Sequence, residues 1–531
     1  MQRTRRAFLA EVGQGMLLAS VGPAIASELG LVSAWAAETP GTLNFGRRES
    51  LVCLLQETPT ERLLPTLVER LQQGTKLLDL VAAAALANAR TFGGEDYVGY
   101  HSMMALSPSY AMAQELPPER QALPVLKVLY RSCNRIQEKG GRKHEVFRAV
   151  EPAELPAGQT GADALHMAIQ KKDKQQADRL LTGLVRHSPE DAYNALLHSV
   201  EDQTEVHRVV LAYRVWDIYN LLGKEEAETL LRQSVHYCVD AERYQQSPTW
   251  ESPKTLLPRL LDQFRLMNGS EGKRTAADFW VETMCKTIFE SKPEQAAEAA
   301  AAALAEGMDP NALAEAIILA ANQLLLRDRG RPKQEGGKPP AGDAALARSA
   351  SNKPAGSCHG DSIGVHASDS ANAWRNIARV SNPCNRAAAL ILGAYQAARD
   401  RVQRGGDFLT WKPYPLPEHL EQVRAKDIAG LVREVEEAIR VNDQIRACAA
   451  VHRCGQLGLA FEPMQALMLK YAISEDGALH AEKYYRTATE EFRAARPAFR
   501  WRHLTALARV TASEYGMPAP GYEDACRLLK V

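Results

Sequence analysis

Apolar and polar residues alternate along this chain with the spacing of helices. Apolar side chains recur every three or four residues, alanine is abundant, and the two-residue alternation of β-strands is nearly absent. Several runs begin with a capping or acidic residue followed by proline, whose missing N–H costs nothing at a helix start. These starts are Ser188-Pro189, Asp309-Pro310 and Glu462-Pro463. The pattern therefore predicts an all-α protein.

Four of the apolar runs begin close to a histidine. The histidines are His101, His207, His366 and His480. Each run is ended by proline or glycine 16 or 17 residues later, and a second helical run follows. Another helical run precedes each histidine. We therefore predict a helical repeat array of about four three-helix units, each with a lead helix, a histidine helix and a return helix.

The third unit is longer than the others. From Pro189 to His207 is 18 residues, whereas from Pro310 to His366 is 56. The extra segment, 327–362, is rich in Gly, Pro, Ser and Lys and predicts an insertion loop that ends beside His366. Residues 37–326 then hold the first two units and the start of the third, and residues 363–531 hold the rest of the third and the fourth.

The N-terminus has the pattern of a twin-arginine export signal. Arg5 and Arg6 precede a mildly apolar stretch that closes with Ala34-Trp35-Ala36, a small-x-small cleavage site. We expect residues 1–36 to be a signal peptide, the twin-arginine translocase to be a partner during export, and the mature protein to be periplasmic. The alternative is a retained membrane anchor. After cleavage no integral membrane segment is expected.

Composition excludes some functions. The chain has 64 basic and 64 acidic residues, so no basic field favours nucleic acid. Its nine cysteines include no Cys-x-x-Cys pair and no attachment motif for c-type haem. Proteins exported by the twin-arginine route cross the membrane folded and often carry a cofactor or travel with a redox partner. An exported redox protein is therefore an expected partner.

The four histidines are candidate catalytic acids and bases, or ligands of a metal. Neutral imidazole binds transition metals and haem iron and titrates near neutral pH. A helix start disfavours its protonated form. If the array closes around a central cavity, the four rings would meet there and hold haem or a transition-metal ion. The alternative is that each histidine only packs against a neighbouring helix end. Candidate cofactor-binding residues beside them are Tyr100, Arg208, His359 and Trp374.

Three histidine runs resemble the questin oxidase-like family, whose helical members also place histidines ahead of apolar helices. The resembling stretches are Gly99–Met112, Val206–Leu222 and Gly364–Ile377. The named member of that family inserts oxygen into a polyketide quinone. The resemblance implies an oxidoreductase with His101, His207 and His366 in its site. The sequence thus favours an exported oxidoreductase or metal- or cofactor-binding protein with a histidine-lined cavity. The alternative is a non-catalytic helical scaffold or binding partner of an exported redox protein.

Overall fold

The computed structural model describes residues 41–243, 249–268, 272–331, 356–358, 362–403 and 406–531. In these residues the chain forms 23 α-helices and no β-strand, which confirms the predicted all-α class. The predicted signal peptide lies outside the described residues. Within these ranges no helix is both long and apolar enough to cross a membrane.

A lead helix, a histidine helix and a return helix follow one another at each of the four predicted places. They are α5 (Leu77–Phe92), α6 (Tyr97–Ala113) and α7 (Ala122–Glu138); α10 (Pro189–Val200), α11 (Val206–Leu222) and α12 (Ala227–Ala241); α16 (Pro310–Arg327), α18 (Ile363–Val380) and α19 (Pro383–Gln403); and α23 (Glu462–Ser474), α24 (His480–Ala494) and α25 (Trp501–Glu514). Within each set the three helices pack against one another. That the sets are true repeats of one unit stays a prediction.

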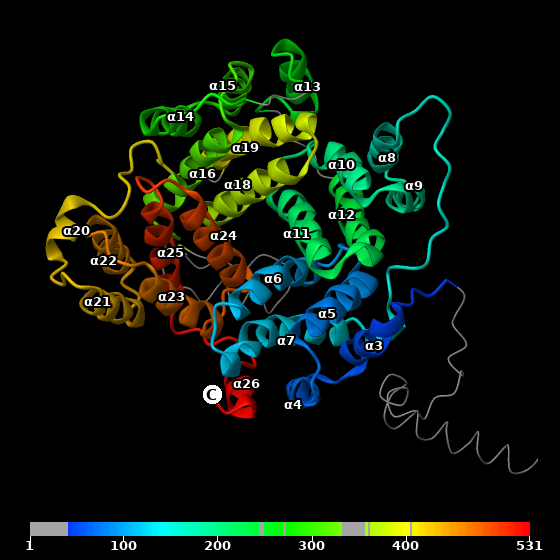
Figure 1. Ribbon diagram of the computed structural model, residues 1–531, viewed down its shortest axis with the longest axis horizontal. Helices are drawn as coiled ribbons and strands as arrows, with labels where there is room; N and C mark the ends of the chain where they lie inside the picture. The colour runs from blue at the N-terminus through cyan, green and yellow to red at the C-terminus, as the bar shows by residue number, and fades with distance from the viewer. Residues whose placement is uncertain (1–40, 244–248, 269–271, 332–355, 359–361, 404–405) are drawn as a thin grey trace, which may run out of the picture.

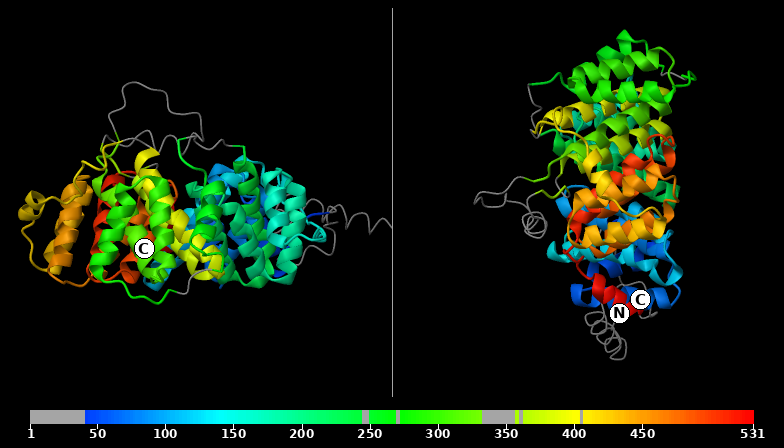
Figure 2. Two further views of the ribbon diagram at one scale, coloured as in Figure 1. Left: turned by 90° about the horizontal axis from the view of Figure 1, so that it is seen from above. Right: turned by 90° about the vertical axis from the view of Figure 1, so that its left-hand side faces the viewer.

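The other helices surround these sets. They are α3 (Glu49–Glu57), α4 (Thr60–Gln72), α8 (Gly161–Gln170), α9 (Lys174–His187), α13 (Pro253–Gln263), α14 (Asp278–Glu290), α15 (Pro293–Ala305), α20 (Pro417–Gln422), α21 (Ile428–Arg440), α22 (Gln444–Gln456) and α26 (Tyr522–Leu529). In Figure 1, α8 and α9 lie at one end of the molecule and α20 to α22 at the other. Seen from above, most helices run across the thickness of the molecule (Figure 2).

The four histidine helices lie around the middle of the molecule (Figure 1). Helix α6 packs against α11 and α24, and α18 packs against the same two helices. The four helices therefore form a closed ring of neighbours, although α6 and α24 lie almost 400 residues apart in the sequence. Their histidines stand in the first or second turn, at the first to the fifth helical position.

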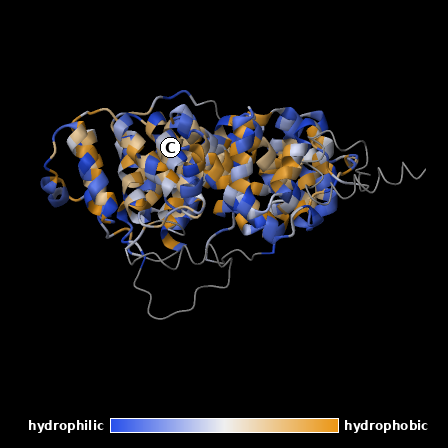
Figure 3. Cartoon of the chain, turned by 90° about the horizontal axis from the view of Figure 1, so that it is seen from below, coloured by the Kyte–Doolittle hydropathy of each residue, from blue (hydrophilic) through white to orange (hydrophobic). Residues whose placement is uncertain are grey.

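The apolar core runs between the helices as one continuous cluster. Apolar positions lie mainly where neighbouring helices face one another, and polar positions face outward (Figure 3). Cys133 and Cys238 are both buried in the return helices of their sets, as expected of a small apolar side chain. None of the nine cysteines, all of which are described, forms a disulfide.

Two glycines let histidine helices approach their lead helices closely. Gly99 and Gly364 each stand two residues before a histidine. A Cβ atom on Gly99 would lie 2.6 Å from the Phe92 ring, and one on Gly364 would lie 2.7 Å from the backbone of Leu325. The second contact is with backbone, which cannot rotate away. A glycine is thus required for α18 to pack at its present depth against α16.

The predicted insertion loop lies largely outside the described residues, but its described ends meet. The N–H of Arg331 donates to the carbonyl of Ser357 at 3.1 Å, and the N–H of Gly356 donates to the carbonyl of Arg331 at 2.8 Å. Arg327, the first residue of the predicted loop, still belongs to α16. The chain therefore leaves and re-enters the helical body at one place, just before α18.

Candidate functional site

The four predicted histidines meet at the centre of the ring of helices. We call them the histidine cluster: His101, His207, His366 and His480. Ring centroids are 4.8 Å apart for His101 and His207 and 5.2 Å apart for His101 and His480. They are 5.9 Å apart for His207 and His366 and 5.2 Å apart for His366 and His480. Each ring thus contacts two others, and the four rings form one packed group.

His101 is the most deeply buried member, with no exposed side-chain surface. Its Nδ1 lies 2.8 Å from the carbonyl oxygen of Tyr97. A carbonyl only accepts, so Nδ1 carries the proton and Nε2 presents a lone pair. Nε2 is buried and has no hydrogen-bond partner within the described residues. Burial, then the nearby charge of Lys483, holds the pKa of His101 well below its usual value. Burial, more than the helix start, therefore keeps this ring neutral.

His207 is oriented by a carboxylate. Glu205 caps the start of α11, and its Oε1 lies 2.7 Å from Nδ1 of His207. The Tyr237 hydroxyl donates to the other oxygen of Glu205 at 2.8 Å. Partial burial would raise the pKa of Glu205, but His207 and the N–H of Arg208 outweigh it and hold that pKa well below its usual range. Glu205 is thus an anionic acceptor for Nδ1 of His207. Nε2, on the other side of the ring, is buried and has no hydrogen-bond partner in the described part of the chain.

His366 and His480 approach each other through their Nε2 atoms, which are 3.2 Å apart. Nδ1 of His480 lies 3.1 Å from the carbonyl oxygen of Ala478. Because that carbonyl only accepts, Nε2 of His480 also presents a lone pair. Three of the four rings are therefore anchored through Nδ1 to an acceptor outside the cluster. The Nε2 atoms of His366 and His480 are within hydrogen-bond distance of each other.

A buried lysine and a buried aspartate lie beside the cluster. Lys483 follows His480 by one turn of α24, and burial lowers its pKa to about 8, partly offset by Asp369 and Glu482. Asp369 follows His366 by one turn of α18 and accepts a hydrogen bond from Thr487 at 2.8 Å; burial raises its pKa. No sequence pattern had pointed to Lys483. Its position three residues after a candidate histidine was the only available signal, because such a pair shares one helix face.

A cavity of about 750 Å³ opens beside His207. Its aromatic lining is Tyr97, Tyr100, Tyr237, Trp250 and Tyr395. Glu205 and Arg399 also line it, and Arg399 donates to the hydroxyl of Thr204 at 2.6 Å. Of the histidine cluster only His207 reaches this cavity. The cavity therefore borders the cluster on the side of His207.

The predicted cofactor-binding residues beside the histidines have different outcomes. The structure brings Tyr100 to the cluster, with its ring centroid 5.0 Å from that of His101 and 5.3 Å from that of His207. Arg208 is directed elsewhere: its guanidinium donates to the carbonyl of Ser199 and to Glu242. His359 lies outside the described residues.

Trp374 is also directed elsewhere. Its indole N–H donates to the side-chain oxygen of Gln396 at 2.7 Å, between α18 and α19. Trp374 stands eight residues after His366, about 12 Å along the helix axis. Its buried ring therefore joins a histidine helix to its return helix rather than facing the cluster.

The four imidazoles are the candidate ligands for a cation, because neutral imidazole binds transition metals. The four rings come from four helices, and Nε2 of His101 and of His207 have no protein partner in the described structure. Two imidazoles that share one metal ion at about 2.1 Å hold their nitrogens about 3.0–3.4 Å apart. The separation of 3.2 Å between His366 and His480 falls in this range. Within the described residues, no three His, Cys, Asp or Glu side chains already have the full spacing of metal ligands.

No family model matches the chain, and comparison with curated proteins and with solved structures finds no match.

Proposed function

We propose that the histidine cluster binds one transition-metal ion and that the protein is an oxidoreductase acting on a planar aromatic compound in the adjoining cavity. The observation that carries the metal site is the pair of buried, unpartnered Nε2 atoms of His101 and His207, beside the close Nε2 pair of His366 and His480. Buried polar atoms without partners are costly, and a cation would satisfy them together. Binding requires small ring rotations that bring His101 and His207 toward the other pair.

A single ion fits this site better than haem. The rings contact one another at 4.8 to 5.9 Å between centroids, which leaves no room for a porphyrin among them. Neutral imidazole suits iron, copper, nickel and zinc. A redox-active ion of this group would supply the electron-transfer chemistry that imidazole side chains lack.

The surrounding residues have separate roles in this proposal. Glu205 fixes the proton of His207 on Nδ1, and Tyr237 holds Glu205 in place. Burial, together with the charge of Glu205, keeps the pKa of Tyr237 far above its usual value, so its hydroxyl remains a donor. The Lys483 amine, with its pKa lowered to about 8 by burial, is a candidate for proton exchange one turn after His480 on α24. His207 is the member of the cluster that borders the cavity.

The cavity lining supports an aromatic substrate. Tyrosine and tryptophan rings from four separate segments face this space, and aromatic walls favour flat, polarisable ligands. The resemblance of the histidine runs to the questin oxidase-like family points to the same substrate class and to oxidation as the reaction. We keep export by the twin-arginine route in the proposal, since that route carries proteins already folded around their metal.

Metal analysis tests the proposal. Protein purified after export should contain about one transition-metal ion per chain. His101→Ala and His366→Ala should each abolish most of it, and the double variant should lose little more, because the ligands act as one unit. His503→Ala is the matched control: His503 is also buried with an unpartnered Nε2 among the described residues, but it belongs to α25 outside the cluster.

Two results would contradict the proposal. The first is protein without metal that also fails to bind added Fe(II), Cu(II), Mn(II) or Zn(II). The second is an equal loss of metal in His503→Ala. Additive losses of stability without any effect on metal content would instead support the alternative, in which each histidine only packs against a neighbouring helix.

A further inference from the structure

A second cavity, of about 430 Å³, concentrates positive charge at the end of α18 away from the histidines. Four cationic side chains line it: Lys273, Arg375, Arg379 and Arg386. Among the described residues that line it, Asp309 is the only acidic one. Because the whole chain has equal numbers of acidic and basic residues, this excess is a local feature.

The lining acid does little to neutralise these cations. Asp309 caps the start of α16, and its carboxylate accepts the N–H of Asn311 at 2.9 Å. Arg375 pairs with Glu491 of α24, yet its Nε is buried without a hydrogen-bond partner in the described structure. Among the described residues, Arg386 forms a hydrogen bond only through its Nε, which donates to the carbonyl of Ala378 at 3.2 Å. Its terminal nitrogens therefore remain available to a ligand.

The arginines are placed to act together. Arg375 and Arg379 are four residues apart on α18 and so share one face of the helix. Arg386 follows in the first turn of α19, across the short connection after α18. Planar guanidinium groups that converge on a concave surface bind phosphate oxygens in pairs, which lysine alone cannot do.

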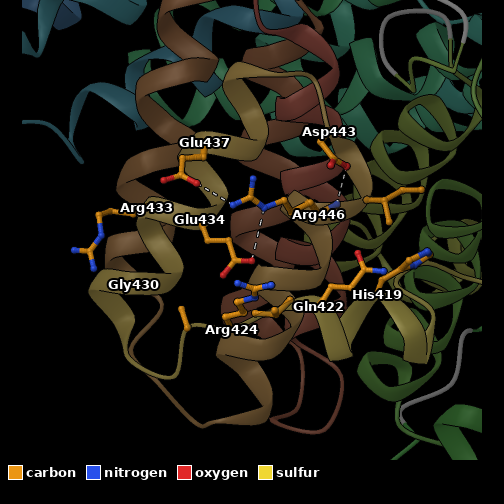
Figure 4. A pocket seen from close by; sticks show the side chains of 12 residues that line it. His419, Gln422, Arg424, Gly430, Arg433, Glu434, Glu437, Asp443 and Arg446 are labelled. Atoms are coloured by element: carbon orange, nitrogen blue, oxygen red, sulfur yellow. Dashed lines mark hydrogen bonds and ion pairs between the residues drawn. The ribbon is translucent and has the colours of Figure 1, made fainter.

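A larger cavity at α20 to α22 shows the contrast. Figure 4 shows its lining, in which Arg424, Arg433 and Arg446 stand among Glu434, Glu437 and Asp443. There Arg446 lies 2.8 Å from Glu437 and 3.7 Å from Glu434. Equal numbers of acids and arginines leave that cavity without an excess of charge.

We infer that the cavity lined by Lys273, Arg375, Arg379 and Arg386 binds a small phosphate-bearing molecule. Its volume lies in the range of small-molecule sites, and it is concave, whereas a protein-docking surface is broad and flat. The site stands independently of the histidine cluster. Arg375 lies nine residues beyond His366, about 13 Å along α18.

Isothermal titration of the full chain with pyrophosphate tests this inference. We expect saturable binding of one pyrophosphate per chain, weakened by added salt. The variant Arg379→Ala/Arg386→Ala should bind at least ten-fold more weakly. Arg424→Ala/Arg433→Ala, which removes two arginines from the balanced cavity, should bind as the unaltered protein does. Arg375 is left in place because it joins α18 to α24.

The outcomes are distinct from those of the metal proposal. Pyrophosphate could also bind a metal ion held by the histidine cluster, and His101→Ala removes that possibility. Pyrophosphate binding should persist in His101→Ala. Its loss there would contradict a site separate from the histidine cluster. Absence of saturable binding would overturn the inference, as would equal weakening in both arginine double variants. Citrate binding as tightly as pyrophosphate would overturn the assignment to phosphate.

Discussion

At the scale of single residues, the positions of protons on the imidazoles decide what the cluster can do. His101 and His480 donate from Nδ1 to backbone carbonyls, and His207 donates to Glu205. A carbonyl or a carboxylate on Nδ1 leaves Nε2 as the ligand atom and sharpens its direction. Of these three Nδ1 contacts, only the one of His207 is with a charged side chain, so we expect His207 to respond most to a change in its Nδ1 partner.

Replacing Glu205 with Gln should weaken metal binding about 10- to 100-fold, because the neutral amide orients the His207 ring less firmly than the carboxylate does. Competition with a chelator measures this affinity. Asp427→Asn is the control, since Asp427 caps α21 in the same way, through the N–H of Gly430 at 2.8 Å, far from the cluster in sequence. Unchanged affinity in Glu205→Gln would contradict an orienting role.

At the scale of helices, a buried network joins α12 and α9 to the turn that precedes α6. His236 of α12 lies 2.9 Å from Glu95 through Nδ1 and 3.0 Å from Asp178 through Nε2. Lys174 pairs with Glu95 and Arg232 with Asp178. Burial alone would lower the pKa of His236, but its hydrogen bonds to the two carboxylates outweigh burial and raise it. The charged imidazole therefore stabilises this junction.

The raised pKa of His236 determines how its contribution to the free energy of unfolding depends on pH. It is fully present below the unfolded pKa of about 6.5 and is lost as pH rises through the higher folded value. His236→Gln should thus reduce the free energy of unfolding by about 1.5–3 kcal/mol at pH 6 and by less at pH 9. Urea unfolding at both pH values measures the difference. The exposed His187→Gln should show little change, and a pH-independent effect of His236→Gln would contradict the role of its charge.

At the scale of the whole molecule, contacts between the first and last helix sets close the ring. Lys127 of α7 lies 2.7 Å from Glu482 of α24 and also donates to the carbonyls of Ala472 and Glu475, each at 2.8 Å. Both side chains of the ion pair are buried. Because His101 and His480 belong to these two sets, the same contacts hold their rings together.

Lys127→Met should destabilise the protein by about 3–5 kcal/mol, because it leaves the Glu482 carboxylate buried without its partner. Lys470→Met is the matched control. Lys470 lies 2.8 Å from Glu436 on an exposed surface, and its loss should cost about 1 kcal/mol or less. Urea unfolding compares the two variants. Equal losses would show that the buried pair does not stabilise ring closure.

The sequence by itself determined the helices and the place of the histidines within them. Prolines, capping residues and glycines act locally, so Pro189, Pro310 and Gly223 mark helix ends whatever surrounds them. The same local signals put each histidine near a helix start. The order of lead, histidine and return helices could therefore be predicted from spacing alone.

Only the tertiary structure decided which side chains meet. Arg208 follows His207 directly, yet a step of one residue turns a helix by about 100° and directs the guanidinium to Ser199 and Glu242. Lys483 and Tyr237 join the site because α24 and α12 pack where they do. Such neighbours depend on contacts between residues from tens to hundreds of positions apart, and no local pattern encodes them. Helix ends depend on nearby residues in the sequence, whereas the direction and the neighbours of a buried side chain depend on how the helices pack.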